Sequence, residues 1–442
     1  MEEFIAAIDL GTTKVVTILG RRSADNKVHI IASSEVPSKG IMRGEVLNIR
    51  EVEEAIRVTV NDVRQKSGID FKEVYVGIAG QHIRRIDSRL DNIRHDDYEE
   101  ISAREISEMK EKMYKTSIEP GEKILHVIPQ SYNVDSHLGV APDAVVGMLG
   151  KRIEGNYRIF VGRTQSANYT QRCVEQAGLR LKQLVLEPLA SAKAVLSDDE
   201  KAIGVAMVDI GGGTTDLVVY YDNIVRHTAV IPFGGNVVTE DIRHGCGILS
   251  RDANNIKLQY GSCFSDLVNN TMLVLKGVNG REAREFTFKF LAEIIEARMS
   301  EIIEAVMYEI ERSGYADKLP AGIVFTGGGA MIQHLSEFVR AKTGMEARIA
   351  KPLNITSDSA DEVKQCSYST AVGLLLKGLE VALPVEEKEE LVVEIEEEEI
   401  VVKKPEKPIK TKKPTKPTSR ISIGFGTLFD DFFKVTPDAD QV

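Results

Sequence analysis

Two aspartates, each followed by glycines and threonines, have the residue types and spacing best suited to chemistry. The central one lies in Val208-Asp-Ile-Gly-Gly-Gly-Thr-Thr-Asp-Leu-Val-Val-Tyr220, between an apolar run and a β-branched run. This pattern predicts a β-hairpin with its turn over Asp209–Thr215, in which three glycines can take positive φ: Gly211, Gly212 and Gly213. Backbone N–H groups of such a turn converge on a space that suits phosphate oxygens, and Asp209 could hold Mg²⁺ through water. A tight hairpin without a ligand is the alternative.

The same pattern recurs near the N-terminus in Ile8-Asp-Leu-Gly-Thr-Thr-Lys-Val15, where Asp9 ends a strand and Val15 begins the return strand. A third glycine loop, in Ile323-Val-Phe-Thr-Gly-Gly-Gly-Ala-Met-Ile332, leads into a predicted helix over 331–342. In Rossmann and Walker loops the glycines open directly into a helix, so neither hairpin belongs to those classes. The combination resembles the nucleotide fold shared by actin, DnaK and sugar kinases, in which two related halves clamp ATP.

Composition and charge restrict the class of protein. A chain of 442 residues is too long for one core, so two or more domains are expected. A net charge of −11 argues against nucleic acid as the main partner. The N-terminus lacks the basic region of a signal peptide, and no apolar stretch reaches the ~20 residues that cross a bilayer, which favours a cytoplasmic protein. Scattered cysteines suit structural thiols rather than a metal site: Cys173, Cys246, Cys263 and Cys366.

Periodic segments around the hairpins predict the elements that position them. In the first half, a helix over 52–65 precedes a strand over 74–78. Residues 83–160 differ in character, with a charged helix and a long strand, and fit a small domain inserted into the first half. In the second half, a long amphipathic helix is expected over 290–312. A last helix of small and apolar residues over 368–376 is expected to cross back to the first half.

After residue 383 the composition changes. Glu386–Ile400 holds nine Glu against one Lys, and Lys403–Arg420 holds eight basic residues against one Glu, which with the prolines predicts a disordered linker. The segment 425–434 predicts an amphipathic helix on a membrane surface, with an apolar arc of about 140° formed by Phe425, Leu428, Phe429, Phe432 and Phe433. We expect the basic linker to add electrostatic attraction to an anionic leaflet. Docking of this helix in a protein groove is the alternative.

Taken together, these motifs resemble the FtsA family of bacterial cell-division proteins, actin-like membrane anchors for the tubulin-like FtsZ. Beside the glycine loops, the resemblance rests on Leu125-His-Val-Ile-Pro-Gln130, Arg226-His-Thr-Ala-Val-Ile-Pro232, Gly235-Asn-Val-Val-Thr239, Pro352-Leu-Asn-Ile-Thr356 and Tyr368-Ser-Thr-Ala-Val-Gly373. The first of these segments and the inserted domain favour FtsA over DnaK or MreB.

The resemblance implies an α/β, actin-like two-lobed ATPase fold with an inserted subdomain IC, which replaces IB of actin and lies on the other side of IA. The two lobes would clamp ATP between their hairpins. The implied boundaries are 1–82 and 161–198 for IA, 83–160 for IC, 199–225 and 303–365 for IIA, 226–302 for IIB, 366–383 for the crossing helix, 384–420 for the disordered charged linker and 421–442 for the amphipathic membrane-targeting helix.

The resemblance also assigns roles to individual residues. Asp9 and Asp209 would hold Mg²⁺, and Lys14 would reach the β- and γ-phosphate oxygens of ATP. Further nucleotide contacts would come from Gly11, Thr12, Thr13, Gly211, Gly212, Gly213, Thr214, Asn236, Lys257, Gly327, Gly328 and Gly329. Lys257 would lie against the adenine and ribose, the alternative being a solvated helix lysine.

Glu187 is the one candidate for a catalytic role. The segment Glu187-Pro-Leu-Ala190 resembles a chaperone segment whose glutamate orients the attacking water, whereas other FtsA sequences often lack this acid. Glu187 is therefore either a water-positioning residue or a helix N-cap acid beside Pro188. His126 and His137 are expected to be packed or solvated, and His126 is expected in a strand away from the loops.

The resemblance implies a protein that binds ATP, forms actin-like filaments and has at most weak ATPase activity. Such a protein would tether FtsZ to the inner face of the cytoplasmic membrane at the division septum. The FtsZ C-terminal tail is expected on IIB near Arg298 and Lys289, and later division proteins are further expected partners. Rival functions are a small-molecule kinase of the same fold and an assembly factor of the PilM or DnaK type. A kinase needs an aspartate base facing a second substrate, and no motif places one.

Overall fold

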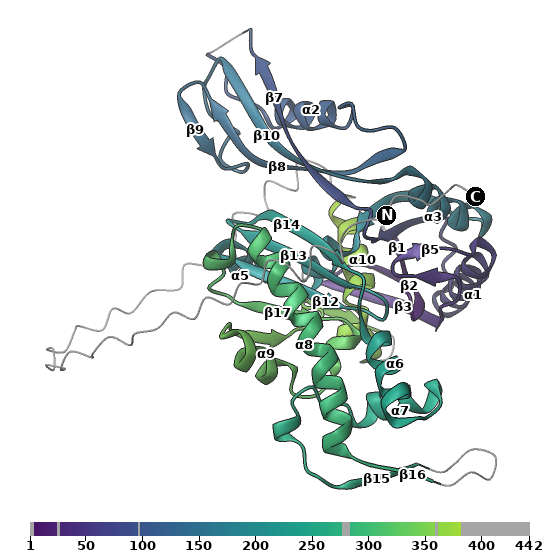
Figure 1. Cartoon of the computed structure of the whole chain (residues 1–442). Helices are drawn as coiled ribbons and strands as arrows, with labels where there is room; N and C mark the ends of the chain where they lie inside the picture. The colour runs from purple at the N-terminus through teal and green to yellow at the C-terminus, as the bar shows by residue number, and fades with distance from the viewer. Residues whose placement is uncertain (1–3, 24–26, 96–97, 276–282, 359–360, 382–442) are drawn as a thin grey trace, which may run out of the picture. The chain divides into compact units, whose positions relative to one another are not determined.

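The structure is a computed structural model (Figure 1). The residues that it describes belong to one compact unit and are 4–23, 27–95, 98–275, 283–358 and 361–381. The predicted linker over 384–420 and the predicted amphipathic helix over 421–442 lie outside the described residues.

The first half is built on a sheet with the strand order β11-β6-β1-β2-β3-β19. β1, β2 and β3 are antiparallel neighbours, whereas β6, β11 and β19 join in parallel. These strands are Phe4–Leu10 (β1), Lys14–Arg22 (β2), Val28–Pro37 (β3), Glu73–Ile78 (β6), Arg180–Leu186 (β11) and Ile355–Ser357 (β19). The short strands β4 (Ile41–Met42) and β5 (Glu45–Val46) precede helix α1 (Ile49–Ser67), which packs on β2 and β3.

The second half repeats this arrangement in the order β14-β13-β12-β17-β18. In each half, a strand that carries the hairpin aspartate pairs with its antiparallel return strand on one side and with a parallel strand on the other. These strands are Val205–Ile210 (β12), Thr215–Tyr221 (β13), Ile224–Ile231 (β14), Ile323–Thr326 (β17) and Ala347–Ile349 (β18). Both predicted hairpins are confirmed.

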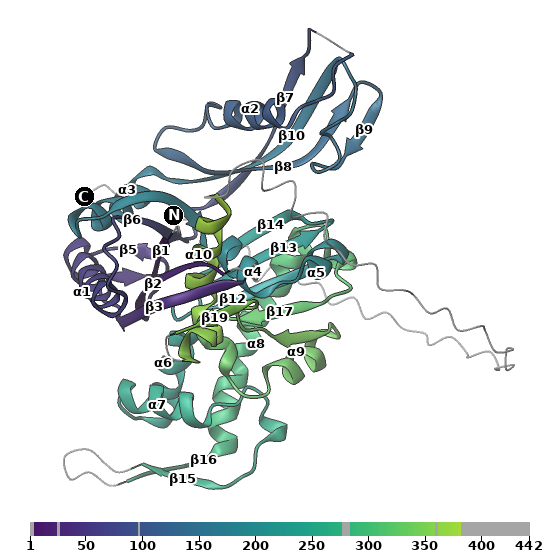
Figure 2. The same ribbon diagram turned by 180° about the vertical axis from the view of Figure 1, so that it is seen from behind.

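Two helices lie between the sheets and contact each other, α4 (Glu187–Val195) and α10 (Ser369–Val381) (Figure 2). α10 packs on β1, β2 and β6, which confirms the predicted return to the first half, and α4 contacts strands of both sheets. The two helices pack so closely that a Cβ on Gly373 of α10 would overlap the backbone of Ala190 in α4. This pair therefore joins the two halves, with α5 (Asp198–Ile203) leading from α4 into β12.

The insert is a separate antiparallel sheet with the order β7-β10-β8-β9, and it has a core of its own. Its strands are Arg84–Ile93 (β7), Glu122–Val134 (β8), His137–Val140 (β9) and Arg152–Arg163 (β10), and its helix is Ala103–Met113 (α2). In the core, the rings of Tyr132 and Tyr157 meet edge to face at 6.0 Å. The chain enters the insert after β6 and leaves it from β10 into α3 (Thr164–Gln176), so it is an excursion from the first half.

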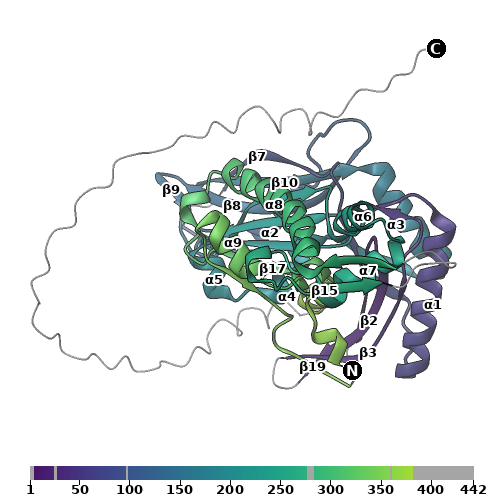
Figure 3. The same cartoon turned by 60° about the horizontal axis from the view of Figure 1, so that its bottom comes forward.

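A helical subdomain follows β14 (Figure 3). It contains Gly235–Cys246 (α6), Ser250–Tyr260 (α7), the hairpin of Met272–Leu275 (β15) and Arg284–Thr287 (β16), and Phe288–Arg312 (α8). α8 confirms the predicted amphipathic helix, because its apolar stripe lies buried against α6 and the second sheet. Gly314 follows it with φ of 73°, the left-handed conformation that ends helices.

The helix predicted directly after the third glycine loop begins later than expected. Gly327 has φ of 86°, Gly328–Met331 forms a short 3₁₀ turn, and Ile332 is extended. His334 is left-handed with φ of 62°, and only then does α9 (Leu335–Thr343) begin. The prediction of a helix over 331–342 is therefore wrong at its start, because the loop makes a second reversal before the helix.

Candidate functional site

The hairpin turns of the two halves line one cavity of about 530 Å³, a size typical of small-molecule sites. It brings together every residue predicted to contact nucleotide or metal, and Glu187. The predicted residues in its wall are Asp9, Gly11, Thr12, Thr13, Lys14, Glu187, Asp209, Gly211, Gly212, Gly213, Thr214, Asn236, Lys257, Gly327, Gly328 and Gly329. They come from elements of both halves and of the helical subdomain. Residues that are far apart in the sequence are therefore brought together by the fold.

The glycines of the central turn serve a different purpose from the predicted one. None of Gly211, Gly212 and Gly213 has positive φ, so that prediction is wrong. Instead, a Cβ on Gly212 would overlap the Thr13 hydroxyl, and a Cβ on Gly213 would lie 2.6 Å from Oγ1 of Thr12. Glycine is needed because the two turns approach each other closely across the cavity.

The start of α6 is bonded to the same turn. The N–H of Gly235 donates to the carbonyl of Gly211 at 2.9 Å, and the N–H of Asn236 donates to that of Gly212 at 2.8 Å. Thr215 anchors the incoming chain, since its hydroxyl donates to the carbonyl of Phe233 at 2.8 Å. Asn236 is thereby held in the cavity wall by the turn itself.

Five carboxyl groups line the cavity, and the mutual repulsion of the four that are deeply buried is its main electrostatic feature. Burial and the nearby Asp209 raise the pKa of Asp9 to about 7. Burial, then Asp9, Asp216 and Asp209, raise the pKa of Glu187 well above its ordinary value. Burial, then Asp209 and Asp9, do the same to the pKa of Asp216, while burial also raises the pKa of Asp209. The cavity therefore favours a positively charged ligand.

Asp216 is a residue of the central motif that sequence reasoning left without a role. It lies directly opposite Asp209 in the β12–β13 ladder, where like charges destabilise a sheet. Its Oδ1 atom is buried and makes no hydrogen bond to any described residue. The sequence did contain a signal for this residue. In a hairpin with a short turn, an acid near the start of the return strand is expected to lie opposite an acid near the end of the first strand.

The donor set fits Mg²⁺ held largely by water and phosphate. Among the described residues, no cluster of three or more His, Cys, Asp or Glu side chains is arranged to hold a metal ion. Mg²⁺ is commonly bound by one or two carboxylates together with waters and substrate phosphates. Asp9, with its pKa near neutrality, and Asp216, whose Oδ1 atom has no partner among the described residues, would supply carboxylate oxygens to such a cation, whose charge would favour their ionised forms.

Asp209 is oriented by helices α4 and α10. Its Oδ2 atom accepts a hydrogen bond from the Ser191 hydroxyl at 2.6 Å and another from the Thr370 hydroxyl at 3.1 Å. Ser191 and Thr370 also lie 3.0 Å apart, oxygen to oxygen. Neither hydroxyl was predicted, because only the folded contact between the two helices brings them to Asp209.

Lys14 lies at the edge of the cavity and is held by two residues that the sequence did not single out. Its Nζ is 2.6 Å from Oε2 of Glu35 and lies 3.7 Å from the ring centroid of Tyr368. The Tyr368 hydroxyl donates to the same Glu35 oxygen at 2.7 Å. A phosphate in the cavity would compete with Glu35 for the Lys14 amine.

Lys257 is not a solvated helix lysine, which was the alternative. Its amine donates to the carbonyl of Gly235 at 2.9 Å and to the hydroxyl of Thr239 at 2.7 Å. Burial lowers the pKa of Lys257 to about 8. The side chain joins α7 to the first turn of α6 at the cavity wall.

Glu187 is the first residue of α4, and its carboxyl group lines the cavity rather than capping the helix. Its side chain rests on Gly77 of β6, where a Cβ would lie 2.9 Å from both Cγ and Oε1 of Glu187. The residue before it, Leu186, donates its N–H to Nε2 of His126 at 3.1 Å. His126 is thus packed, as predicted, and it lies beside the junction of β11 and α4. Burial lowers the pKa of His126 to about 3.

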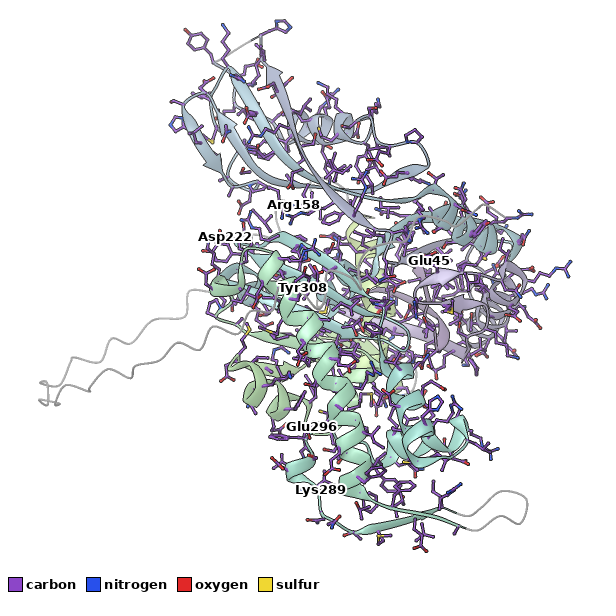
Figure 4. All side chains as sticks on the ribbon, in the orientation of Figure 1. Glu45, Arg158, Asp222, Lys289, Glu296 and Tyr308 are labelled. Atoms are coloured by element: carbon purple, nitrogen blue, oxygen red, sulfur yellow. The ribbon has the colours of Figure 1, made fainter. Side chains whose placement is uncertain are left out.

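The residues predicted to bind FtsZ lie on α8, outside the cavity. Arg298 is paired with Asp241 of α6 at 2.6 Å and with Glu301 at 2.5 Å, so its charge is balanced. Lys289 is the second residue of α8, near the β15–β16 hairpin (Figure 4).

The residues predicted to bind membrane lie outside the described residues: Phe425, Leu428, Phe429, Phe432 and Phe433. Within the described ranges, no helix has the length and apolar character needed to cross a membrane.

Comparison with known proteins gives the family. The family model described as Cell division protein FtsA matches residues 206–373, and that of the SHS2 domain inserted in FtsA matches residues 80–161. The Cell division protein FtsA of Neisseria meningitidis serogroup B is 37% identical over 378 residues, covering 85% of this chain and 90% of the relative. The chain belongs to the FtsA family.

Solved structures show the same fold at low sequence identity. The PilM–PilN type IV pilus biogenesis complex matches with a TM-score of 0.59 at 15% identity, over 86% of this chain and 99% of that chain. MreB 5 of Spiroplasma citri bound to AMPPNP matches with a TM-score of 0.51 at 14% identity, over 89% of this chain and 98% of that chain. This FtsA-family chain therefore has the predicted actin-like ATPase fold, and the predicted insert matches the SHS2 domain model.

Proposed function

We propose that this member of the FtsA family binds ATP with Mg²⁺ in the cavity between its two hairpins. The observation that carries the proposal is that one cavity gathers two aspartate hairpins, the third glycine loop and Lys14. MreB 5, which has the same fold, is described as bound to AMPPNP. Backbone N–H groups of the turns would bind phosphate oxygens, and Asp9 and Asp209 would hold the hydrated cation, whose charge offsets that of the phosphates.

Calorimetric titration of ATP, with and without Mg²⁺, tests this proposal. We expect Asp209→Ala to abolish measurable binding, because the cation loses a buried carboxylate and the phosphate charge is then left uncompensated, and because the hydrogen bonds from Ser191 and Thr370 are lost. Asp198→Ala is the matched control, since Asp198 lies exposed on α5. Wild-type affinity in Asp209→Ala would show that the nucleotide, if bound at all, binds elsewhere.

The proposal extends to assembly. As expected from the family, the chain forms actin-like filaments, tethers FtsZ to the inner membrane face at the septum and contacts later division proteins, with at most weak ATPase activity. The helical subdomain offers apolar side chains for a peptide near Lys289, since Tyr260 and Phe290 are exposed. Tyr260 and Phe288 join α7 to the start of α8 with ring centroids 5.2 Å apart.

Co-sedimentation with FtsZ on liposomes tests the tether. Deleting residues 421–442 should release the protein from liposomes while ATP binding persists. Arg298→Glu should weaken binding of the FtsZ tail in fluorescence anisotropy, because it adds repulsion toward an acidic peptide and leaves Asp241 and Glu301 unpaired. Unchanged tail affinity in Arg298→Glu would move the site away from this side of α8.

A further inference from the structure

The segment Leu125–Gln130, which helped to identify the family, has no part in the function described so far. It belongs to β8 of the insert, and two of its side chains contact the two halves separately. His126 accepts the N–H of Leu186 in the first half, at 3.1 Å. Gln130 donates its amide N–H to the carbonyl of Val225 in the second half, at 3.1 Å. β8 therefore bridges the two halves.

The contact with the second half is made at an irregularity of an edge strand. β14 is the outer strand of its sheet, and its pairing passes from His227 opposite Val219 to Val225 opposite Tyr220. Arg226 is thus the extra residue of a β-bulge, which leaves its backbone outside the regular ladder.

The insert supplies the donors for this backbone. Arg85 donates to the Arg226 carbonyl at 3.3 Å, and Arg158 donates to the same oxygen. Arg158 lies on the side of the insert that faces β14 (Figure 4). Its guanidinium is fixed from the other side by Asp87 at 2.9 Å, and its side chain is mostly buried. Two guanidinium groups on one carbonyl make the bulge a docking point for the insert.

Each of the two contacted segments continues along the chain to a residue of the cavity wall. Leu186 immediately precedes Glu187, whose carboxyl group lines the cavity wall. β14 runs from the bulge to Ile231. The chain then continues to Phe233, whose carbonyl accepts from the Thr215 hydroxyl, and to Gly235, whose N–H donates to the carbonyl of Gly211. The insert thus contacts two segments that lead to the cavity wall, one to Glu187 and one to the start of α6.

We propose that His126 and Gln130 are positioning residues of the nucleotide site: through them the insert holds Glu187 and the 211–214 turn in place. This inference rests on the proposed nucleotide binding. His126 suits the role because its lowered pKa, about 3, keeps the imidazole neutral, so that Nε2 remains an acceptor for the Leu186 N–H at neutral pH.

The first test measures the His126 contact. His126→Ala should speed hydrogen exchange of the Leu186 amide and slow single-turnover ATP cleavage about three- to tenfold, the factor for one lost hydrogen bond, while ATP affinity stays unchanged. His126→Gln, which keeps an acceptor at a similar reach, should restore both readouts. His137→Ala is the matched control, because His137 is an exposed histidine of the same insert. Normal cleavage in a folded His126→Ala protein would overturn the role of His126.

The second test measures the contact with β14. Gln130→Ala combined with Arg158→Ala should weaken Mg·ATP binding about three- to tenfold, since the strand that leads to the phosphate turn loses its docking point. Arg152→Ala is the matched control: Arg152 lies on the same strand β10 and pairs with Asp91 of β7, just as Arg158 pairs with Asp87. Equal affinities for the double variant and Arg152→Ala would overturn this half of the inference.

The two proposals fail in different ways. If wild-type protein binds Mg·ATP but His126→Ala and the Gln130/Arg158 variant behave as wild type, positioning by the insert is wrong and nucleotide binding stands. If wild-type protein binds no ATP in calorimetry, the proposed function is wrong, and the inference falls with it. Thermal unfolding of each variant checks that the insert core around Tyr132 and Tyr157 remains folded.

Discussion

The two hairpins share one strand order but differ in how their aspartates are held. Asp9 faces Val16 across its ladder, and no side-chain hydrogen bond joins it to another described residue. Asp209 faces Asp216 and is bound by hydroxyls of α4 and α10. The first hairpin carries a lysine, Lys14, whereas the second carries a second acid, Asp216. The comparison indicates that the two aspartates have different roles. Asp9 is available to a ligand, whereas Asp209 is held by the helices that join the two halves.

The largest expected effect separates the two aspartates. Asp9→Asn should weaken Mg·ATP binding at least about thirtyfold, since losing one partner of a buried charge pair costs about 2 kcal/mol or more. Asp209→Asn should weaken it less, because the amide oxygen still accepts from Ser191 and Thr370. Calorimetry with both variants measures the difference, and a larger loss in Asp209→Asn would reverse the assignment.

The second effect concerns the approach of the two turns. Gly212→Ala should destabilise the protein by about 1–3 kcal/mol, the usual cost of overpacking, because the new methyl group meets the Thr13 hydroxyl. Thr13→Ala in the same chain should recover part of the loss, since the Thr13 Cβ would lie 3.2 Å from the new methyl group. Denaturant unfolding of the four proteins in this cycle gives the coupling, and additive losses would show that the turns do not touch in solution.

The third effect is a dependence of stability on pH. The pKa of Asp9 is raised from 3.8 to about 7 in the folded protein, so between these values the folded state binds more protons than the unfolded state. Its contribution to stability is therefore fully present below about pH 4 and is lost as the pH rises through 7, by up to about 1.4 kcal/mol per pH unit for one proton.

Asp9→Asn removes this titration. The free energy of unfolding, measured without nucleotide from pH 5 to 8, should fall less steeply in the variant than in wild type, and the variant should be the more stable protein at pH 8. Parallel profiles for the two proteins would assign the pH dependence to other groups.

The smallest effect concerns Lys14. Glu35→Gln should strengthen ATP binding by up to about fivefold, since a half-exposed ion pair is worth about 0.2–1 kcal/mol and Glu35 would compete with a phosphate for the Lys14 amine. Asp62→Asn, which removes the Lys66 pair on α1, is the control. Weaker ATP binding in Glu35→Gln would show instead that Glu35 helps to place Lys14 for the ligand.

Local patterns in the sequence predicted much of this fold. Both hairpins follow from an aspartate, glycines and flanking β-branched runs, and α8 follows from its apolar stripe. Most of the candidate nucleotide-site residues were found because they lie in short motifs, whereas Lys257 was assigned by the family resemblance alone. The family resemblance then predicted that separate loops meet.

Contacts between distant segments could not be predicted in this way. Ser191 and Thr370 meet Asp209 only because α4 packs against α10. His126 reaches Leu186, the residue before Glu187, only because the insert folds back on the first half. The glycines of the central turn were explained by positive φ, whereas the reason lies in Thr12 and Thr13, which are remote in sequence.

Hydrogen exchange measured with and without Mg·ATP tests the central claim most directly, that both hairpins bind the same nucleotide. The account predicts that the backbone amides of 11–14 and of 211–214 become protected together, because N–H groups of both turns donate to phosphate oxygens. Protection of one turn without the other, or of neither at saturating Mg·ATP, would contradict it.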